Sequence, residues 1–538
     1  MAVIAFLCIY WKGYLNPTND KWIMSGYDET DIIQHYSGWI AFRNSDWSFP
    51  LGLAKDMAVP EGTCISFTDS IPWVAIFFKI FRGLLPETFQ YFGLYLLLSY
   101  ILQGIASFKV IEYKTKSLVY SLIGEVLLLF VPCFLDRSLR HTALSSQWLI
   151  LFSILVWMKH KESYRLRTYI YYLVFLVLAI GIHPYFLPMI GMFMLLSVID
   201  DIQRKKFLSI AYLFGSLGIT CLTGLLIGVL GTGVKASRDG YGFYSMNLNS
   251  LLNPTSIGGY RWSAFLGVRP QTLGNYEGFL YAGVGVMAGL LVAAVLLIIK
   301  GDIRKAPSVL KRNIPLIAVC VFCTLFAISN TVTYDDMILF KVPLPKFIEE
   351  TCGIFRSSAR ILYPVFYLIC IGIILTVWKY GKFGNKRAPY YIMLILCVIQ
   401  IMDLRYALIE KNHRMQAGLV FESILDDPGL NSIFEKSDSF MIQSGFLRWD
   451  YAMSIVPLKH HNKLYYSTAV SGSYDIAEEE KDKICSYVER TGDIGKNVMV
   501  TDNPEEVARF ISHDNIGYYE LNGLYYMADM GLSEYLHK

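Results

Sequence analysis

The acidic residues that follow the first apolar segment of the chain are of a type that could carry catalysis at a membrane surface. Asp31 is followed by Gln34 and His35, and helical spacing places these two side chains on the same face as Asp31. A carboxylate that is partly removed from water has a raised pKa, which suits it to take a proton as a general base. Asp28 is a second candidate for this base. The alternative is a solvated helix N-terminus, where Asp is favoured.

Arginine and histidine side chains farther along the chain could bind an anion such as a phosphate. Arg137 and His141 lie between two apolar segments, and Arg356 and Arg360 are spaced to share one helix face. A guanidinium group can clamp a phosphate by two parallel hydrogen bonds. The alternatives are a local ion pair within Asp136–Arg140 for the first pair and contact with lipid headgroups for the second.

Other polar and aromatic residues of predicted loops are suited to the hydroxyl groups and ring faces of sugars. Carboxylates and amides form hydrogen bonds with hydroxyl groups, and aromatic rings stack on C–H surfaces. For two candidates a structural role is the alternative, because Asp69 could cap a helix that begins at Pro72, and His183 could stabilise a break between two apolar segments. The candidates for acceptor or sugar binding are Gln34, His35, Asp69, His183, Tyr241, Asn253 and Glu277.

The composition places these residues in a membrane protein. Hydrophobic residues make up 54% of the 538 residues and charged residues 17%, against about 25% charged residues in ordinary soluble domains. The aromatic fraction of 15% fits aromatic belts at two membrane interfaces. The net charge is only +4, and the basic residues lie in short loops rather than in one stripe, so no nucleic-acid partner is expected.

The apolar segments predict an all-α polytopic bundle, since a helix that spans a bilayer needs about 20 residues. The segment 71–85 is shorter and carries Lys79 and Arg82, and it is predicted to be an interfacial helix with Trp73 and Phe77 facing lipid. About eleven spans are predicted, near 1–15, 88–108, 117–134, 143–158, 168–182, 184–199, 207–230, 276–299, 313–329, 358–378 and 389–406.

The distribution of basic residues predicts the orientation of the bundle. Every second connection is basic, and such connections lie on the cytoplasmic side. The N-terminus is therefore expected inside, and the C-terminus and the loops that carry the candidate residues are expected on the extracytoplasmic side of the cell membrane. The basic connections lie within 109–116, 159–167, 204–206, 300–312 and 379–387.

The last part of the chain has a different composition, with shorter apolar runs and more charge. Val498–Val500 is predicted to be a strand, and Asn503 is expected to cap a helix with Pro504 in its first turn. Asn522 and Gly523 predict a tight hairpin turn. The expected organisation is a membrane domain over 1–406, with a first outer loop at 16–87, and a small extracytoplasmic α/β domain over 407–538.

Several stretches resemble the glycosyltransferase C superfamily of membrane enzymes that use polyprenyl-phosphate sugars, in particular an uncharacterised bacterial branch of it. The similarity covers roughly 16–365. The stretches run from Asp31 to Gly52, from Thr68 to Pro72, from Phe89 to Gly93, and from Phe355 to Arg360. The resemblance implies a first outer loop with an essential acid, amphipathic surface helices and a core of seven spans.

The same resemblance implies transfer of a sugar from a polyprenyl-phosphate donor to an extracytoplasmic glycan or cell-envelope acceptor, with inversion. Asp31 or Asp28 would be the base, and the donor phosphate would be bound by Arg137, Arg356, Arg360 and His141. Some members of the superfamily use a divalent metal, although the acids here form no compact metal-binding pattern. The alternatives are a transporter or flippase of a lipid-linked glycan, and a non-catalytic membrane protein that binds glycan.

Overall fold

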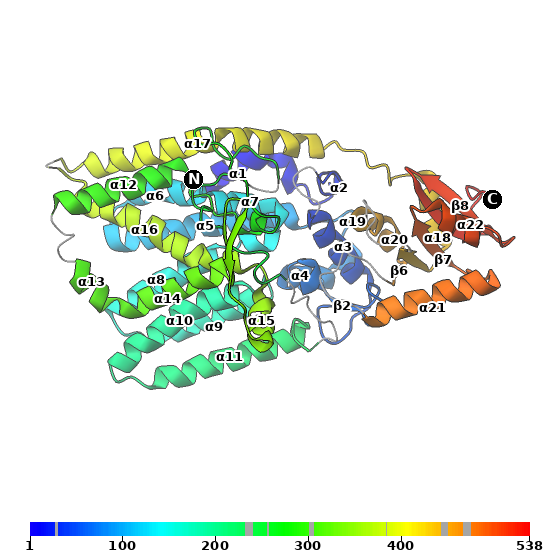
Figure 1. The fold of residues 1–538 in the computed structure, drawn as a ribbon, viewed down its shortest axis with the longest axis horizontal. Coiled ribbons are helices and arrows are strands. Elements are labelled where there is room, and N and C mark those ends of the chain that lie inside the picture. Colours follow the sequence, from blue (N-terminus) through cyan, green and yellow to red (C-terminus); the bar gives the residue numbers. More distant parts are fainter. Residues whose placement is uncertain are drawn as a thin grey trace. The chain divides into compact units, whose positions relative to one another are not determined.

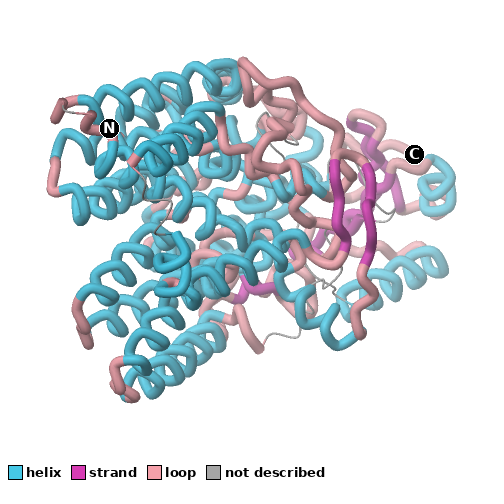
Figure 2. Tube along the Cα trace, turned by 60° about the vertical axis from the view of Figure 1, so that its left-hand side comes forward, coloured by secondary structure: helices cyan, strands magenta, loops and turns pink. Residues whose placement is uncertain are grey.

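The chain folds into two units, each built from segments that are far apart in the sequence. The computed structural model describes residues 1–26, 31–231, 240–255, 258–300, 306–383, 385–442, 450–465 and 475–538. The first unit comprises Met1–Leu15, Phe92–Cys221 and Arg238–Gln416. The second unit comprises Asn16–Tyr91, Leu222–Ser237 and Ala417–Lys538. Helices make up most of both traces, and strands are few (Figures 1 and 2).

The first unit is a helical bundle with one small β-hairpin. Its described residues also form five short 3₁₀ segments: η1 (Lys12–Leu15), η4 (Thr142–Ser145), η5 (Asn275–Gly278), η7 (Gly353–Phe355) and η8 (Ser358–Leu362). The hairpin is formed by β3 (Thr331–Tyr334) and β4 (Met337–Lys341). The helices are α1 (Ala2–Tyr10), α5 (Phe92–Thr115), α6 (Leu118–Leu129), α7 (Pro132–Arg140), α8 (Trp148–Glu162), α9 (Arg167–Ile180), α10 (Phe186–Gln203), α11 (Leu208–Ile227), which continues into the second unit, α12 (Val284–Ile299), α13 (Ala306–Arg312), α14 (Ile314–Ile328), α15 (Lys346–Cys352), α16 (Tyr363–Tyr380) and α17 (Ala388–Gly418).

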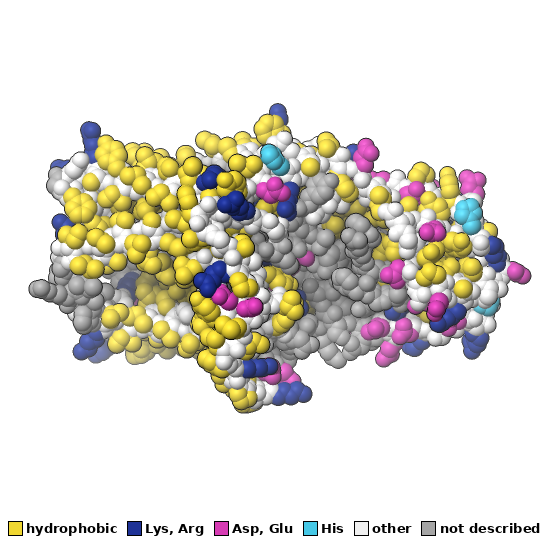
Figure 3. Space-filling view, turned by 45° about the horizontal axis from the view of Figure 1, so that its top comes forward, with side chains coloured by type: hydrophobic (Ala, Val, Ile, Leu, Met, Phe, Trp, Pro, Cys, Tyr) yellow, Lys and Arg dark blue, Asp and Glu magenta, His cyan; other side chains and the backbone are white. Residues whose placement is uncertain are grey.

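The described residues contain six helices that are long and apolar enough to cross a membrane, or seven if the bent pair α6 and α7 forms one span. The chain is thus a multi-pass membrane protein, and hydrophobic side chains cover much of the helical surface in Figure 3. The predicted number of about eleven spans is not confirmed. The helix within 1–15 has only 9 residues, which is about 14 Å, and α9, α12 and α14 are also short.

The bend between α6 and α7 has a local cause. The two helices meet at an angle of 60°. Pro132 occupies the first turn of α7, and Val131 before it is extended with ψ 128°. A residue that precedes proline is pushed out of the helical region, so the helix is interrupted at this point. The bend places the charged C-terminal half of α7 inside the unit.

The long helix α17 is fastened to the start of α12 by a buried carboxylate. Asp403 Oδ2 accepts hydrogen bonds from the Tyr281 hydroxyl at 2.7 Å and from the Val284 backbone N–H at 2.9 Å, and its Oδ1 accepts one from Ser263 Oγ at 2.5 Å. Val284 is the first residue of α12, so Asp403 satisfies one of its free N–H groups. The domain boundary predicted at 406 falls inside this helix.

The second unit combines residues 16–91 with the C-terminal segment. The first part contains α2 (Lys21–Met24), α3 (Asp31–Asn44), β1 (Leu53–Ala54), β2 (Thr63–Cys64), η2 (Ile65–Thr68), α4 (Pro72–Ile80) and η3 (Arg82–Leu84). The C-terminal part contains α18 (Pro428–Lys436), β5 (Ser439–Ile442), α19 (Asp450–Met453), α20 (Ile455–Lys459), β6 (Lys463–Leu464), α21 (Asp475–Thr491), β7 (Asn497–Thr501), α22 (Pro504–Phe510), β8 (Ile516–Leu521) and β9 (Leu524–Asp529).

The C-terminal segment forms a mixed five-stranded sheet in the order β6-β5-β7-β9-β8. The local predictions for this segment are confirmed: β7 contains Val498–Val500, and the Asn503 side chain caps α22 by accepting the Glu505 N–H at 3.0 Å. Asn522 and Gly523 link β8 to β9 with φ of 54° and 76°. Positive φ at both central residues defines the type I′ turn that Asn-Gly favours.

Residues 16–91 pair directly with the C-terminal segment in this unit. The Leu464 N–H of β6 donates to the Asp56 carbonyl at 2.8 Å, and the Val59 N–H donates to the Leu464 carbonyl at 3.0 Å. The Lys459 ammonium group lies 3.0 Å from an oxygen of Asp20. The first outer loop and the C-terminal segment of the prediction thus fold together.

The segment 71–85, which was predicted to be an interfacial helix, contains the nine-residue helix α4. Phe77 is exposed and Trp73 is half-buried. Lys79 of the same helix is buried, with its ammonium group 3.9 Å from the ring centroid of Phe42 and 4.7 Å from that of Trp47. Burial lowers the pKa of Lys79 to about 8, so most of its ammonium groups are still charged at neutral pH. The charged group can therefore hold α4 against the rings of Phe42 and Trp47.

Candidate functional site

A buried cluster of charged side chains lies in the first unit. Arg137 comes from α7, Arg360 from η8 and Glu277 from η5. One oxygen of Glu277, Oε2, lies 3.0 Å from Arg137 Nη2 and 2.5 Å from Arg360 Nη2. Burial alone would raise the pKa of Glu277, but the charges of the two guanidinium groups outweigh it and hold that pKa well below its usual range. Glu277 is therefore a carboxylate at neutral pH that joins two arginines.

His141 lies between the same two arginines. Its Nδ1 is 3.2 Å from Arg137 Nη1, and its Nε2 is 3.4 Å from Arg360 Nη2. Burial lowers the pKa of His141 well below its usual value, and the neighbouring arginines lower it further. A neutral imidazole has one acceptor nitrogen, so it can accept a hydrogen bond from only one of the two guanidinium groups.

Asp136 and Arg140 extend this cluster. Asp136 Oδ2 pairs with Arg140 Nη2 at 3.0 Å, which is the local ion pair considered above, and it lies 3.7 Å from Arg137 Nε. The carboxylates of Asp136 and Glu277 thus hold the three arginines Arg137, Arg140 and Arg360 together. Guanidinium groups held in place can bind an anion by charge-assisted hydrogen bonds.

Arg356 and Arg360 contact different aromatic rings. The Arg356 side chain is half-buried, and its guanidinium carbon lies 5.7 Å from the ring centroid of Tyr244. The guanidinium carbon of Arg360 lies 5.1 Å from the ring centroid of Tyr185. Of the two, Arg360 is the one that the described contacts join to Arg137, through Glu277, and to His141.

The other predicted residues of the first unit have local contacts. His183 Nδ1 accepts the backbone N–H of Tyr185 at 3.2 Å, which is the structural role considered as the alternative. Asn253 Oδ1 accepts the backbone N–H of Arg269 at 3.1 Å, and its Nδ2 donates to the Arg269 carbonyl at 3.1 Å, so Asn253 fastens a loop. Tyr241 is half-buried and packs 5.3 Å from the ring of Phe326.

An apolar groove runs between α14 and α16 in the same unit. Its volume is about 460 Å³. Val365 lines it and follows Arg360 by five residues, so the groove begins within two turns of the arginine cluster along the chain. The lining residues are Leu316, Ile317, Cys320, Val321, Thr324, Leu325, Val365, Leu368 and Ile369.

The second unit holds the predicted acids. Asp31 is the first residue of α3 and is half-buried, and Gln34 and His35 of the same helix are buried. Asp28, the second candidate for the base, lies outside the described residues. His35 Nε2 lies 4.0 Å from Asp69 Oδ2. Burial lowers the pKa of His35 to about 3, so this imidazole is neutral.

Asp69 occupies a strained turn against α3. Its φ is 53°, and Ile71 has a φ of 54°, a region that β-branched residues rarely adopt. The N-cap residue of α4 is Ile71, so Asp69 does not occupy the N-cap position that the alternative interpretation gave it. Strained backbone of this kind costs about 1–3 kcal/mol per residue and is concentrated at functional sites.

The surrounding hydrogen bonds explain how the turn is held. Ser70 Oγ donates to the His35 carbonyl at 2.7 Å, and the Tyr91 hydroxyl donates to the Ser70 carbonyl. Gly38 lets the turn approach α3, because a Cβ at this position would overlap the side chains of Thr68 and Ser70. The Asp69 carboxylate is thereby fixed beside α3.

A buried link in the second unit could not be found from the sequence. Asp20 Oδ2 accepts the Tyr36 hydroxyl at 3.0 Å and lies 3.0 Å from Lys459 Nζ. The lysine is 439 residues from Asp20, and no local pattern connects them. The link orients α3 through Tyr36, which directly follows Gln34 and His35 in that helix.

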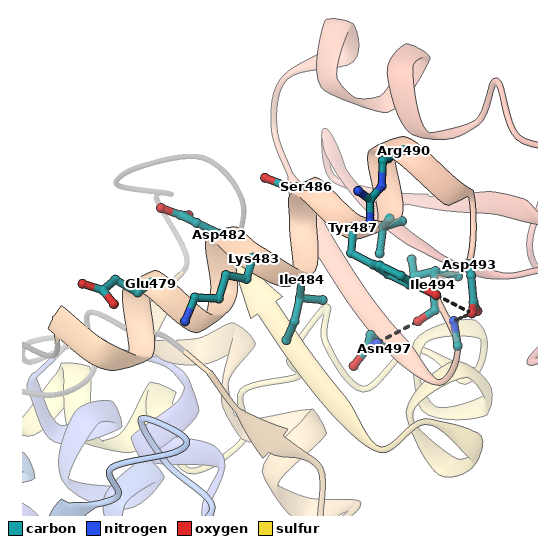
Figure 4. A pocket seen from close by; sticks show the side chains of 12 residues that line it. Glu479, Asp482, Lys483, Ile484, Ser486, Tyr487, Arg490, Asp493, Ile494 and Asn497 are labelled. Atoms are coloured by element: carbon teal, nitrogen blue, oxygen red, sulfur yellow. Dashed lines mark hydrogen bonds between the residues drawn. The ribbon is translucent and has the colours of Figure 1, made fainter.

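The C-terminal segment carries an open surface pocket of about 1070 Å³ (Figure 4). The Tyr487 hydroxyl of α21 lies 3.3 Å from Asp493 Oδ2 at one side of it, and Glu479, Lys483 and Arg490 add mixed charge. None of the predicted site residues lines this pocket. Elsewhere too, the described part of the chain contains no group of three or more His, Cys, Asp or Glu side chains that could hold a metal ion.

Comparison with known proteins gives one family and one solved structure. Residues 1–405 match the family described as Domain of unknown function (DUF6311). No curated protein matches the chain. The fold is similar to that of the archaeal oligosaccharyltransferase AglB from Archaeoglobus fulgidus, whose structure is in complex with an inhibitory peptide and a dolichol-phosphate. The sequence identity is 12% and the TM-score is 0.42, and the alignment covers 98% of this chain and 73% of that chain. A TM-score this low supports no conclusion on function.

Proposed function

We propose that this chain, which belongs to the DUF6311 family, is a membrane glycosyltransferase that moves a sugar from a polyprenyl-phosphate donor to an extracytoplasmic glycan or cell-envelope acceptor. The observation that carries the proposal is the buried arginine cluster, in which Arg360 lies five residues before Val365 of an apolar groove of about 460 Å³. A lipid phosphate combines an apolar chain with an anionic head, and these two features match its two parts.

The donor would use the two features in different ways. Its isoprenoid chain would lie along the groove between α14 and α16, and its phosphate would meet Arg360 and the half-buried Arg356. Arg137 is fully buried and shares Glu277 with Arg360, so its role would be to hold Arg360 in place. Arginines fixed before the reaction stabilise the charge that develops on a departing phosphate.

The reaction would be a single inverting displacement. A carboxylate takes the proton from an acceptor hydroxyl group, whose oxygen forms a bond to the anomeric carbon of the sugar. The bond between this carbon and the phosphate oxygen breaks, and the polyprenyl phosphate leaves with the electron pair. Asp31 is the proposed base, with Asp28 as the second choice. Asp69, held in its strained turn beside His35, would bind the acceptor hydroxyl groups.

Binding of a polyprenyl-phosphate analogue to the purified full-length protein in lipid vesicles tests the donor site. A hydrogen bond to a charged group contributes about 1.5–3 kcal/mol, so Arg360→Ala and Arg356→Ala should each weaken binding about 10- to 100-fold. Arg356→Lys should weaken binding nearly as much as Arg356→Ala, because lysine lacks the planar fork. Headgroup contact alone would instead let lysine replace arginine freely.

Arg405→Ala is the matched control, since Arg405 belongs to the same unit and contacts the Met402 carbonyl and the Tyr406 hydroxyl. Its affinity should equal that of the unaltered protein. Thermal unfolding of each variant separates a loss of binding from a loss of folding. Unchanged affinity in both Arg356→Ala and Arg360→Ala would remove the donor site. Binding of the analogue without sugar transfer would favour a transporter of lipid-linked glycans.

A further inference from the structure

The β3–β4 hairpin of the first unit presents an unusual exposed apolar edge (yellow-green strands leading to α15 in Figure 1). All residues of β4 are exposed, and the four apolar side chains Met337 to Phe340 are 50–62% exposed. The apolar character continues through Val342, Phe347 and Ile354, which are also exposed. Proteins normally protect such an edge strand by charge or by a covering segment.

The hairpin that exposes this edge is anchored by hydrogen bonds to the rest of the first unit. On the opposite edge, the Leu248 N–H donates to the Thr333 carbonyl of β3 at 3.0 Å. At the turn, the Asp335 carboxylate receives two hydrogen bonds from Arg269, at 2.9 and 2.7 Å, and Asn247 Nδ2 donates to the Asp335 carbonyl at 2.7 Å. The hairpin therefore keeps β4 on the outside, away from the residues that anchor β3.

The hairpin lies close to the membrane surface because it joins two apolar helices. α14 ends at Ile328, and β3 begins at Thr331. Three residues reach at most about 11 Å, so the base of the hairpin cannot lie far from the end of α14. At the other side, α15 ends at Cys352, six residues before the apolar span Ser358–Tyr380 begins. The exposed edge thus connects the shorter apolar helix α14 to the candidate membrane span Ser358–Tyr380.

Lysines flank the apolar side chains of this edge. Lys341 ends β4, and Lys346 begins α15, and both are exposed. An aliphatic lysine stem can lie along apolar surface while its ammonium group reaches lipid phosphates. Aromatic and aliphatic side chains with flanking lysines are the composition of segments that lie in a membrane interface.

We propose that the segment from β4 to Ile354 lies in the bilayer interface, at the end of the membrane where α14 terminates and α16 begins. Its apolar side chains enter the boundary between headgroups and acyl chains, about 5–10 Å deep, and Lys341 and Lys346 meet the lipid phosphates. The occupant of the exposed edge is lipid. This inference does not depend on the proposed transferase activity.

The attachment would also connect the bilayer surface to the charged cluster. Thr333 Oγ1 of β3 donates to Asn275 Oδ1 at 3.1 Å, and Asn275 begins the short η5 segment that carries Glu277. Asn275 Nδ2 in turn donates to the Ser245 carbonyl at 3.0 Å. A hairpin fixed in the interface would therefore set the depth of Glu277 and its arginines relative to the lipid headgroups.

Photocrosslinking in vesicles tests the lipid contact directly. The photoreactive p-benzoylphenylalanine is placed at position 339 or 340 of the full chain, since adjacent strand residues point to opposite faces. The protein is reconstituted in vesicles of phosphatidylethanolamine and phosphatidylglycerol and irradiated, and adducts are identified by intact mass. At least one position should give a lipid adduct in several-fold greater yield than the same residue at position 487, an exposed tyrosine of the C-terminal segment.

The other outcomes overturn the proposal in recognisable ways. Both positions are exposed, so the replacements remove no buried contact and the protein should fold. A crosslink to a second copy of the chain would identify β4 as a dimer edge. A crosslink to an added extended peptide, in place of lipid, would identify strand addition. Lipid adducts no more abundant than at position 487 would show that the edge faces water.

Discussion

The arginine cluster of the first unit and the Asp69 turn of the second unit hold their carboxylates in opposite ways. Glu277 is buried and shares one oxygen between Arg137 and Arg360, so ion pairs fix it. Asp69 lies at a positive φ, and hydrogen bonds and close packing of its neighbours fix the turn that carries it. Glu277 is therefore tied to two arginines, whereas the Asp69 carboxylate is placed by the backbone of its turn, 4.0 Å from the neutral His35.

Under the proposed function, the two regions would have separate tasks. The arginine cluster would hold charge on a donor, and the acids of the second unit would activate and orient an acceptor. Each assignment predicts a different response to substitution. Loss of an acid in the second unit should reduce turnover and leave stability nearly intact, whereas loss of Glu277 should first reduce stability.

The largest effect is expected for Asp31→Asn. This substitution keeps the shape of the side chain and removes the proton acceptor, and loss of a general base typically reduces a rate by about 10²- to 10⁴-fold. Turnover of a polyprenyl-phosphate sugar by the purified protein is the measurement, with thermal unfolding as a check on folding. Full turnover in Asp31→Asn, together with its loss in Asp28→Asn, would transfer the role to Asp28.

Glu277→Gln should be the most destabilising change among the charged residues. Removal of one partner from a buried ion pair costs about 3–5 kcal/mol, because the two arginines keep their charge without the carboxylate. Thermal or denaturant unfolding in detergent measures the change, and Glu349→Gln on the exposed face of α15 is the control, with an expected effect within about 0.5 kcal/mol. Equal stability of the two variants would contradict the account of the cluster.

The pH dependence of the same variant gives a second test. The pKa of Glu277 in the folded protein lies well below its usual value, so its contribution to stability is present above the unfolded-state pKa of about 4.3. This contribution is lost as the pH falls through the lower folded-state pKa. The stabilities of the unaltered protein and Glu277→Gln should therefore differ most at neutral pH and converge in acid.

Gly38→Ala tests the packing that holds the Asp69 turn. The added methyl group would overlap Thr68 and Ser70, and overpacking of this kind costs about 1–3 kcal/mol. Gly83→Ala in the same unit is the control, because no atom lies within 4 Å of the position of its Cβ. We expect Gly38→Ala to lower the unfolding midpoint while Gly83→Ala leaves it unchanged. Equal midpoints would show that α3 and the turn can separate without cost.

Local signals predicted the elements of the second unit better than its contacts. The cap at Asn503 and the turn at Asn522 and Gly523 depend on neighbouring residues, and the structure contains both. Asp69 was ambiguous, since an acid before Ser and Pro also fits a helix cap. Its actual place depends on Gly38, which lies 31 residues earlier and gives no signal of its own.

The charged cluster could be predicted only in part, for the same reason. Arg137 and His141 share one turn, so their proximity follows from helical spacing. Glu277 is 140 residues from Arg137 and 83 residues from Arg360, and it was expected to bind sugar. Hydropathy also located the apolar segments, but it does not give the length of the helix that each one forms. For this reason the segment 1–15 was counted as a span, although its helix ends at Tyr10.

The smallest expected effect is the pH dependence caused by His35. Its pKa is about 3 in the folded protein and about 6.5 when unfolded, so the unfolded state binds a proton first as the pH falls. Stability from the neutral, buried ring is complete above the unfolded value and is lost as the pH falls from about 6.5 toward 3, with a loss of about 1.4 kcal/mol at pH 5.5. Unfolding at pH 7.5 and 5.5 should show this loss in the unaltered protein, and His35→Gln should not show it. An equal loss in both would assign the pH dependence to other groups and contradict the neutral, buried state of His35.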